Sequence, residues 1–372
     1  MRVCKQDGLV DAQDRLIFEN VGEGFLDFLD GKELGRQPVF NESALLEARK
    51  VLLRKGENRR LMRLHEFLYK SPSSNPQKAA MEENCMAAVC VEFGEYSRGI
   101  ELARKGFQRL ESSTENIRLN PVFLHFLLTQ ALLEAHLTDE AGKLMDKLNN
   151  LFEDSFKKDL KTITNELLKS YKGESRSGVS FDERSDIDIA LFWHITGRLK
   201  TLSGSLSAAE DALQMAEAIM LQEKNRETLT LEYPEIKISQ AFIALLQEDF
   251  KKSEACLKES LEYYHTKTRY RGRYYFSARG ALSYSLLKQG SSESQTKEIE
   301  AALQGIEANV AENHLGIASC CIWLGESLIK DGNIIAARST FERALRIRKA
   351  ALPENDKDIL AAQELISRLP QT

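Results

Sequence analysis

The sequence predicts an all-α fold, a right-handed solenoid built from antiparallel helical hairpins. Two observations lead to this prediction. Leu, Ala, Glu and Lys, which favour helix, recur throughout the 372 residues, whereas proline occurs only 7 times. Small residues also recur at a spacing of 42 residues, as in Ser260, Ala302 and Ala344, in Gly290 and Gly332, and in Gly99 and Ala141. Independent hairpins have no reason to keep such a register, so we expect stacked repeats.

The order of elements follows from where this register holds and where it breaks. The spacing from Ala141 to Ala209 is 68 residues, and the gap contains a polar stretch rich in glycine and serine. A solenoid also needs polar capping helices at its ends. The sequence therefore predicts an N-terminal helical cap (1–40), degenerate N-terminal repeats (41–171), a polar loop (172–186), C-terminal repeats (187–352) and a C-terminal capping helix (353–372).

The clearest repeat unit runs from Trp193 to Ile219. Its first helix carries Trp193 and, four residues later, Gly197, and its second carries Ala209 and Leu213. A bulky residue next to a small one lets two helices cross closely, and small residues on the second helix accept its neighbours. This pattern resembles the tetratricopeptide repeat.

The last unit makes the resemblance more specific. Residues 336–366, "AARSTFERALRIRKAALPENDKDILAAQELI", resemble the kinesin-light-chain type of tetratricopeptide repeat, in which an "A…F..AL.I" helix is followed by an "L.P" turn. The resemblance implies the solenoid fold and a concave surface that binds partners. Because its motif positions are packing positions, it implies nothing about activity.

Composition restricts the class of protein further. The formal net charge is −5, so attraction of the whole molecule to nucleic acid or anionic lipid is not expected. The six cysteines are scattered and fit a reducing compartment. No apolar run is long enough to span a membrane, and the first residues show no leader pattern, so we expect a cytoplasmic protein.

No catalytic motif is present. The phosphate-binding glycine loops, the H-E-x-x-H helix and the G-x-S-x-G elbow are all missing from the sequence. The six histidines are not clustered with other ligands at metal-binding spacing. The sequence therefore predicts no enzyme, no cofactor and no metal.

The candidate partner-binding residues lie on the first helix of each hairpin, which faces the concave side of a solenoid. A mixture of apolar and sparse polar side chains suits a peptide or protein segment better than a charged polymer. The predicted residues are Asn84, Phe126, Gln130, His194, Arg198, Phe242, Tyr270, Arg273, Ser277, Tyr284, Glu326 and Lys330. Chaperone-binding tetratricopeptide proteins clamp a carboxylate with Lys, Asn and Arg, and that clamp is not evident at the matching positions Asn84, Phe126, His194, Ile238, Gly280 and Ile322.

One stretch, "HTKTRYRGRYYFSARG" (265–280), concentrates arginines and aromatic residues. Helical spacing places Tyr270, Arg273, Ser277 and Tyr284 on one face of a helix that would extend back to Tyr270. Three interpretations stay open: a packed aromatic helix with solvated arginines, a contact site for a peptide, and a nucleic-acid patch. The favoured function is a non-enzymatic scaffold or adaptor for a protein segment. The alternative is an RNA-associated or regulatory repeat protein that uses residues 267–279, and self-association also stays open.

Overall fold

The computed structural model describes residues 12–32, 40–69, 76–111, 121–156, 183–221, 232–268, 271–291 and 295–370. Every regular element in these ranges is helical. They are α2 (Ala12–Val21), α3 (Phe25–Leu29), α4 (Glu42–Lys55), α5 (Asn58–Tyr69), α6 (Pro76–Phe93), α7 (Tyr96–Glu111), α8 (Pro121–Glu134), α9 (Thr138–Phe156), α11 (Glu183–Leu202), α12 (Leu206–Met220), α14 (Glu232–Leu246), α15 (Phe250–Tyr263), the π-helical turn η1 (Tyr264–Thr268), α16 (Arg273–Lys288), α17 (Thr296–Glu307), α18 (Leu315–Lys330), α19 (Ile334–Ala351) and α20 (Lys357–Ser367).

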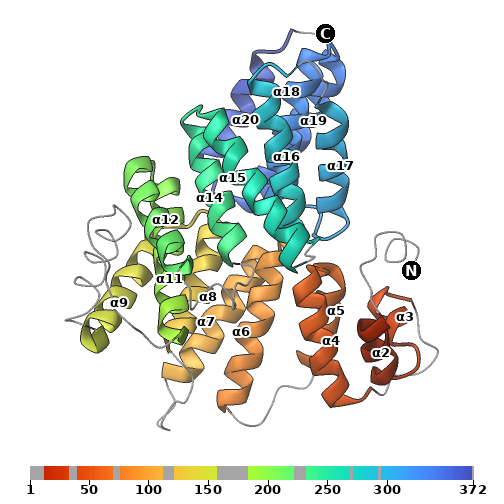
Figure 1. Cartoon of the computed structure of the whole chain (residues 1–372), viewed down its shortest axis with the longest axis vertical. Coiled ribbons are helices and arrows are strands. Elements are labelled where there is room, and N and C mark those ends of the chain that lie inside the picture. Colours follow the sequence, from red (N-terminus) through yellow and green to blue (C-terminus); the bar gives the residue numbers. More distant parts are fainter. Residues whose placement is uncertain are drawn as a thin grey trace.

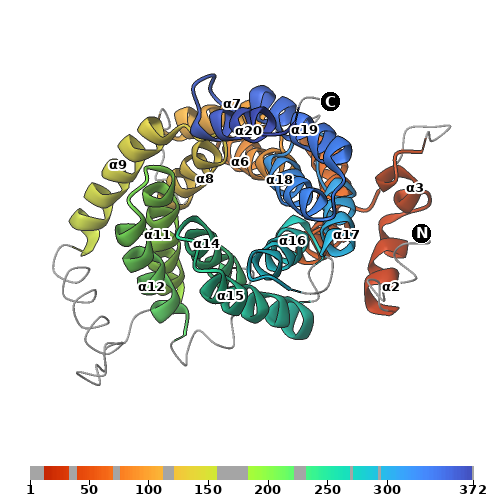
Figure 2. The same ribbon diagram turned by 90° about the horizontal axis from the view of Figure 1, so that it is seen from above.

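Successive helices pair into antiparallel hairpins, and the hairpins stack into a superhelix (Figure 1). Seen from above, α6, α8, α11, α14, α16 and α18 form the inner wall, and α7, α9, α12, α15, α17 and α19 form the outer wall (Figure 2). The predicted all-α, tetratricopeptide-like solenoid is thus confirmed. In the described ranges, no helix combines the length and the hydropathy that crossing a membrane requires.

Two units reach the 42-residue period in different ways. Seven residues link α16 to α17 and seven more link α17 to α18, whereas the last hairpin has longer helices, α18 of 16 and α19 of 18 residues, joined by three residues. Gly290 and Gly332 end α16 and α18 at equivalent positions with φ of 82° and 78°, a conformation that glycine adopts at no steric cost. The register seen in the sequence therefore marks equivalent turns.

Close packing inside each hairpin explains the other small residues. A Cβ atom added to Gly325 on α18 would lie 2.2 Å from Cε1 of Phe341 on α19. Phe341 is fully buried, with Ala337 and Ala344 beside it on the same helix. The glycine lets the ring occupy the space between the two helices, as the repeat pattern predicted.

The superhelix completes one turn, so that its last hairpins lie over its first ones (Figure 2). Backbone bonds join the two layers: the amide of Ala311 donates to the carbonyl of Phe93 at 2.8 Å, and the amide of Arg271 donates to the carbonyl of Lys55 at 3.1 Å. The amide of Leu315 also donates to the Tyr96 hydroxyl at 3.1 Å. Segments more than 200 residues apart in the sequence therefore form a common interface, which no repeat pattern indicated.

The start of α16 differs from the prediction. The helix begins at Arg273, with Gly272 as its N-cap in an extended conformation, so it does not extend back to residue 270. The reason is that α15 continues into η1, and Arg271 then bonds the end of α4 across the layers. Tyr270 itself lies outside the described residues, as does most of the predicted polar loop 172–186.

Candidate functional site

An aromatic stack lies on the concave side of the C-terminal hairpins. The indole of Trp323 on α18 lies nearly parallel to the rings of Phe242 on α14 and Tyr284 on α16, with centroid distances of 6.1 and 6.0 Å. The indole of Trp323 fits here because Gly280 on α16 has no side chain: an added Cβ would lie only 3.2 Å from the ring. Trp323 is 6% exposed, whereas Phe242 and Tyr284 are half-buried. We call Phe242, Tyr284 and Trp323 the aromatic stack.

Charged and polar groups border this stack on one side. The Tyr284 hydroxyl donates to Oε1 of Glu326 at 3.1 Å, and Nζ of Lys288 lies 2.8 Å from Oε2 of the same carboxylate. Nζ of Lys288 also lies 5.4 Å from the centroid of the Tyr284 ring. Further along α18, Nζ of Lys330 donates to the carbonyl of Ser291 at 3.1 Å. Flat apolar rings beside hydrogen-bonding groups are suited to a peptide side chain and its backbone.

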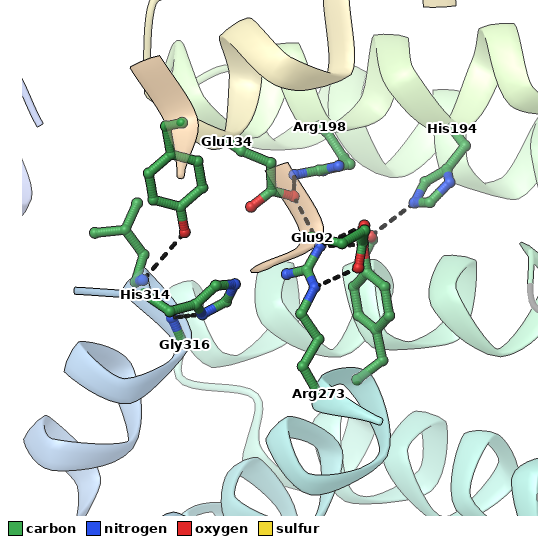
Figure 3. A network of polar contacts seen from close by, with 11 residues as sticks. Glu92, Glu134, His194, Arg198, Arg273, His314 and Gly316 are labelled. Atoms are coloured by element: carbon green, nitrogen blue, oxygen red, sulfur yellow. Dashed lines mark hydrogen bonds and ion pairs between the residues drawn. The ribbon is translucent and has the colours of Figure 1, made fainter. Parts of the chain in front are cut away.

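A second group of residues forms a polar belt between the two layers of the superhelix (Figure 3). Arg273 at the start of α16 makes two bonds to Glu92 at the end of α6, from Nε at 2.6 Å and from Nη2 at 2.8 Å. Arg198 on α11 donates to Glu134 at the end of α8 at 2.6 Å. Nη2 of Arg273 lies 3.5 Å from the same Glu134 oxygen and donates to the Tyr274 hydroxyl at 2.6 Å. We define the polar belt as these five residues.

Electrostatics in the belt favours the ionised pairs. Burial alone would raise the pKa of Glu134, but the guanidiniums of Arg198 and Arg273 lower it to about 2. Burial would likewise lower the pKa of Arg273, yet Glu92 and the neighbouring groups raise it well above its ordinary value. The contacts of Arg273 with Glu92 and Glu134 tie the first layer to the second, whereas the pair of Arg198 and Glu134 joins the neighbouring helices α11 and α8.

Two buried histidines flank the belt. His314 is 1% exposed, and its Nδ1 accepts the amide of Gly316 at 2.9 Å, which caps α18. In the neutral ring the proton therefore lies on Nε2. His194 on α11 bonds Ser239 through Nε2 at 2.9 Å. Burial and neighbouring arginines lower the pKa of each histidine to about 3.

These shifts predict that the protein loses stability as the pH falls from about 6.5 towards 3. A histidine with a depressed folded-state pKa binds its proton mainly in the unfolded chain, so acid favours unfolding. Each of the two histidines should cost about 2 kcal/mol between pH 6.5 and 5. Urea denaturation at several pH values measures the loss. His314→Asn should keep the N-cap of α18 and weaken the dependence of the unfolding free energy on pH. The control is His265→Asn at an exposed position, which should leave that dependence unchanged. If the wild type and both variants show the same dependence on pH, the prediction is wrong.

Most of the predicted concave residues that the structure describes lie in one of three settings. Phe242, Tyr284 and Glu326 meet at the aromatic stack, with Lys330 nearby on the exposed end of α18. Arg198, Arg273 and His194 lie in or beside the polar belt. Gln130 and Ser277 are half-buried on α8 and α16. The side chain of Phe126, on α8, falls outside what the structure describes, as does Tyr270.

Asn84 is not placed as the periodicity predicted. It is 2% exposed, its Nδ2 donates to the carbonyl of Ala80 at 2.8 Å, and a Cβ at Gly106 of α7 would lie 2.5 Å from that nitrogen. Asn84 therefore fills the interface between α6 and α7. Arg273 differs in a similar way: at 6% exposure it is a buried ion-pair partner and no free groove cation.

The arginine-rich stretch is mainly a packed helix start. The guanidinium of Arg271 lies over the Tyr275 ring at 4.2 Å, and Arg279 donates to Glu298 at 2.6 Å. The Phe276 ring lies against Gly305, where an added Cβ would come within 2.2 Å. Arg271, Arg273 and Arg279 thus all have partners within the chain. The alternative of an RNA-associated protein gains no support from this arrangement.

One grouping among the described residues has metal-ligating side chains close together. Ligand atoms of His136, Asp356 and Asp358 lie within 4.8 Å of one another. His136 Nδ1 and Asp356 Oδ2 are 2.9 Å apart, however, and Nη1 of Arg348 donates to the Asp358 carbonyl at 2.7 Å. Asp356 also caps α20 through the Asp358 amide. We therefore assign these residues to the contact between the two layers.

Two signals in the sequence could have located residues that the prediction missed. Glu92 and Glu134 are 42 residues apart, so the same inner position carries a carboxylate in two successive repeats. Phe242, Tyr284 and Glu326 follow the same 42-residue spacing, and Trp323 lies one helical turn before Glu326. The pairing of Glu92 with Arg273 has no local signal, because it depends on the superhelix completing its turn.

Comparisons with known proteins add the following findings. No protein-family model matches the chain, and no curated protein matches it. Among solved structures, BtubC (BKLC) from P. vanneervenii is 18% identical over 70% of this chain and 90% of its own, with a TM-score of 0.40. A Rap protein complexed with competence and sporulation factor is 15% identical over 78% and 71%, with a TM-score of 0.49. The apo form of the quorum sensor NprR from B. thuringiensis is 14% identical over 92% and 96%, with a TM-score of 0.39. Likenesses at this level say nothing about what this chain binds.

Proposed function

We propose that this protein is a non-enzymatic scaffold that binds a peptide segment of a partner protein on its concave face, at the aromatic stack. The observation that carries the proposal is the half-buried pair Phe242 and Tyr284, whose rings both stack on the indole of Trp323. As an adaptor, the protein would hold this segment on the inner wall while the outer helices remain available to a second partner.

The stack has the physical properties of a binding hot spot. Large aromatic side chains supply much apolar area for little loss of conformational entropy, and such residues dominate the affinity of interfaces. Here the rings are already fixed by one another and by the bond from Tyr284 to Glu326, so binding has little ordering cost. Glu326, Lys288 and the end of α18 offer polar contacts at the border of the apolar surface.

The perturbed pKa values of the belt do not by themselves indicate catalysis. Shifts of this size are found at active sites, but structural ion pairs produce them as well. In this protein the shifted groups Glu134 and Arg273 join α8 to α11 and α6 to α16. These contacts between packed helices account for the shifts, which supports a structural role.

Intrinsic fluorescence gives a direct test, because the chain has two tryptophans, Trp193 and Trp323. In a Trp193→Phe background, Trp323 reports on its own site. Peptides selected from a phage-displayed random library on the immobilised protein should change this fluorescence on binding. Phe242→Ala and Tyr284→Ala should each weaken binding about 30-fold, since losing a hot-spot side chain costs about 2 kcal/mol.

Ile335→Ala provides the matched control. Ile335 is 74% exposed on the outer helix α19, so this variant should bind the selected peptides as the parent does. Circular dichroism at the assay temperature checks that each variant is folded. If the selected peptides bind the Phe242→Ala/Tyr284→Ala double variant as tightly as the parent, the aromatic stack is not the binding site.

A further inference from the structure

A carboxylate on α14 lies on the same helical face as the aromatic stack. Glu235 is in the first turn of α14, and Phe242 follows seven residues later. Seven residues are close to two helical turns, so both side chains project from one face, about 10 Å apart along the axis. Glu235 is half-buried, as is Phe242. The inner face of α14 therefore presents an acid and an aromatic ring at a fixed separation.

The charged and titratable groups around Glu235 come from every inner helix near it. They are Glu92 of α6, Arg198 of α11, Glu232 of α14, and Arg273 and Tyr274 of α16. Both guanidiniums are already engaged, Arg273 by two bonds to Glu92 and Arg198 by its bond to Glu134. No cation of the described residues is therefore left to pair with Glu235.

The direction of the pKa shift of Glu235 agrees with this imbalance. Burial, followed by the charges of Glu92 and Glu232, raises the pKa of Glu235 well above its ordinary value, and the two arginines oppose this only in part. Four carboxylates, those of Glu92, Glu134, Glu232 and Glu235, thus lie around the two guanidiniums of Arg198 and Arg273. A further cation placed there would let Glu235 ionise and form a charge-assisted hydrogen bond.

We infer that the peptide bound at the aromatic stack carries a lysine or arginine side chain that pairs with Glu235, about 10 Å from the residue that contacts Phe242. This inference rests on the proposed function and specifies the chemistry of its ligand. An apolar or aromatic residue of the segment contacts the stack, and a basic residue three or four positions away in an extended peptide reaches the acid. Charge complementarity thereby fixes the direction in which the segment lies on α14.

The test uses a peptide selected on the full-length protein, its variant with the basic residue replaced by methionine, and its N-acetylated form. The methionine variant should bind the wild-type protein at least tenfold more weakly, and N-acetylation should have little effect. Glu235→Gln should bind the parent and methionine peptides about equally. The Glu235→Gln side chain keeps the shape of the glutamate, so folding should be unchanged.

Proton release supplies a readout that does not depend on the choice of peptide. A bound cation should lower the raised pKa of Glu235, so calorimetry in buffers of different ionisation enthalpy should show proton release for the wild type and none for Glu235→Gln. Equal binding of the lysine and methionine peptides, or a loss confined to the N-acetylated form, would overturn the inference. A failure to select any peptide that depends on the aromatic stack would count against the proposed function itself.

Discussion

Replacing Arg273 by methionine should destabilise the protein by roughly 3–5 kcal/mol, the usual cost of leaving a buried charge without its partner. The substitution removes both bonds between Arg273 and Glu92 and leaves the Glu92 carboxylate without its partner. It also removes one of the two cations beside Glu134. Because Glu92 and Arg273 belong to different layers of the superhelix, their separation should also loosen the contact between layers. The midpoint of urea denaturation and the radius of gyration from small-angle scattering measure the two effects.

Two comparison proteins make this result interpretable. The double variant Arg273→Met/Glu92→Gln removes both charges and should recover most of the lost stability, since a neutral pair has no uncompensated charge to bury. Arg104→Met breaks the exposed ion pair between Arg104 and Glu140 and should cost less than about 1 kcal/mol. If Arg273→Met costs no more than Arg104→Met, the polar belt does not hold the layers together.

Truncating Phe341 to alanine should cost about 3–5 kcal/mol, the range for removing a buried phenylalanine. The ring is fully buried between α18 and α19 and lies against Gly325, so the variant leaves a cavity inside the last repeat. Thermal melting followed by circular dichroism, together with hydrogen exchange of α18 and α19, measures the loss and shows where it acts. Exchange should increase first in this hairpin, since repeats are stabilised by their nearest neighbours.

The glycine partner offers the complementary experiment. Gly325→Val places new atoms where the Phe341 ring lies and should destabilise by about 1–3 kcal/mol through overpacking. Combining it with Phe341→Leu should restore part of the loss, because the smaller side chain makes room. Gly142, whose added Cβ would meet nothing within 4 Å, is the control: Gly142→Ala should not destabilise. Equal effects at Gly325 and Gly142 would contradict the packing role of the repeat glycine.

The repeat pattern predicted a large part of the fold, because its signals are local. Gly325 with Phe341, and Gly197 with Leu213, are small and large residues of one hairpin, separated by 16 residues in each case. Turn glycines such as Gly290 and Gly332 need a positive φ that the adjacent sequence already favours. The same local periodicity placed Phe242, Tyr284 and Glu326 on the inner wall, where they meet around Trp323.

The site residues that periodicity misplaced depend on contacts beyond one hairpin. Asn84 has the spacing of a concave residue, but the close approach of Gly106 allows α7 to cover it. Arg273 has that spacing as well, yet it lies against Glu92, 181 residues away in sequence. A periodic pattern describes each hairpin and its neighbours. It carries no information about where the accumulated rotation of many hairpins brings the two ends of the chain.

By itself the sequence determined that this protein is a helical-repeat solenoid, and it identified small residues that recur every 42 residues and named Phe242, Tyr284 and Glu326 as inner-wall candidates. The tertiary structure alone decided that the superhelix completes a turn, that Arg273 and Glu92 become a buried ion pair, and that Glu235 lies near two arginines already bonded to other carboxylates. The physical reason is that hairpin packing is fixed by neighbouring side chains, whereas pairing of distant charges depends on the cumulative geometry of the whole stack.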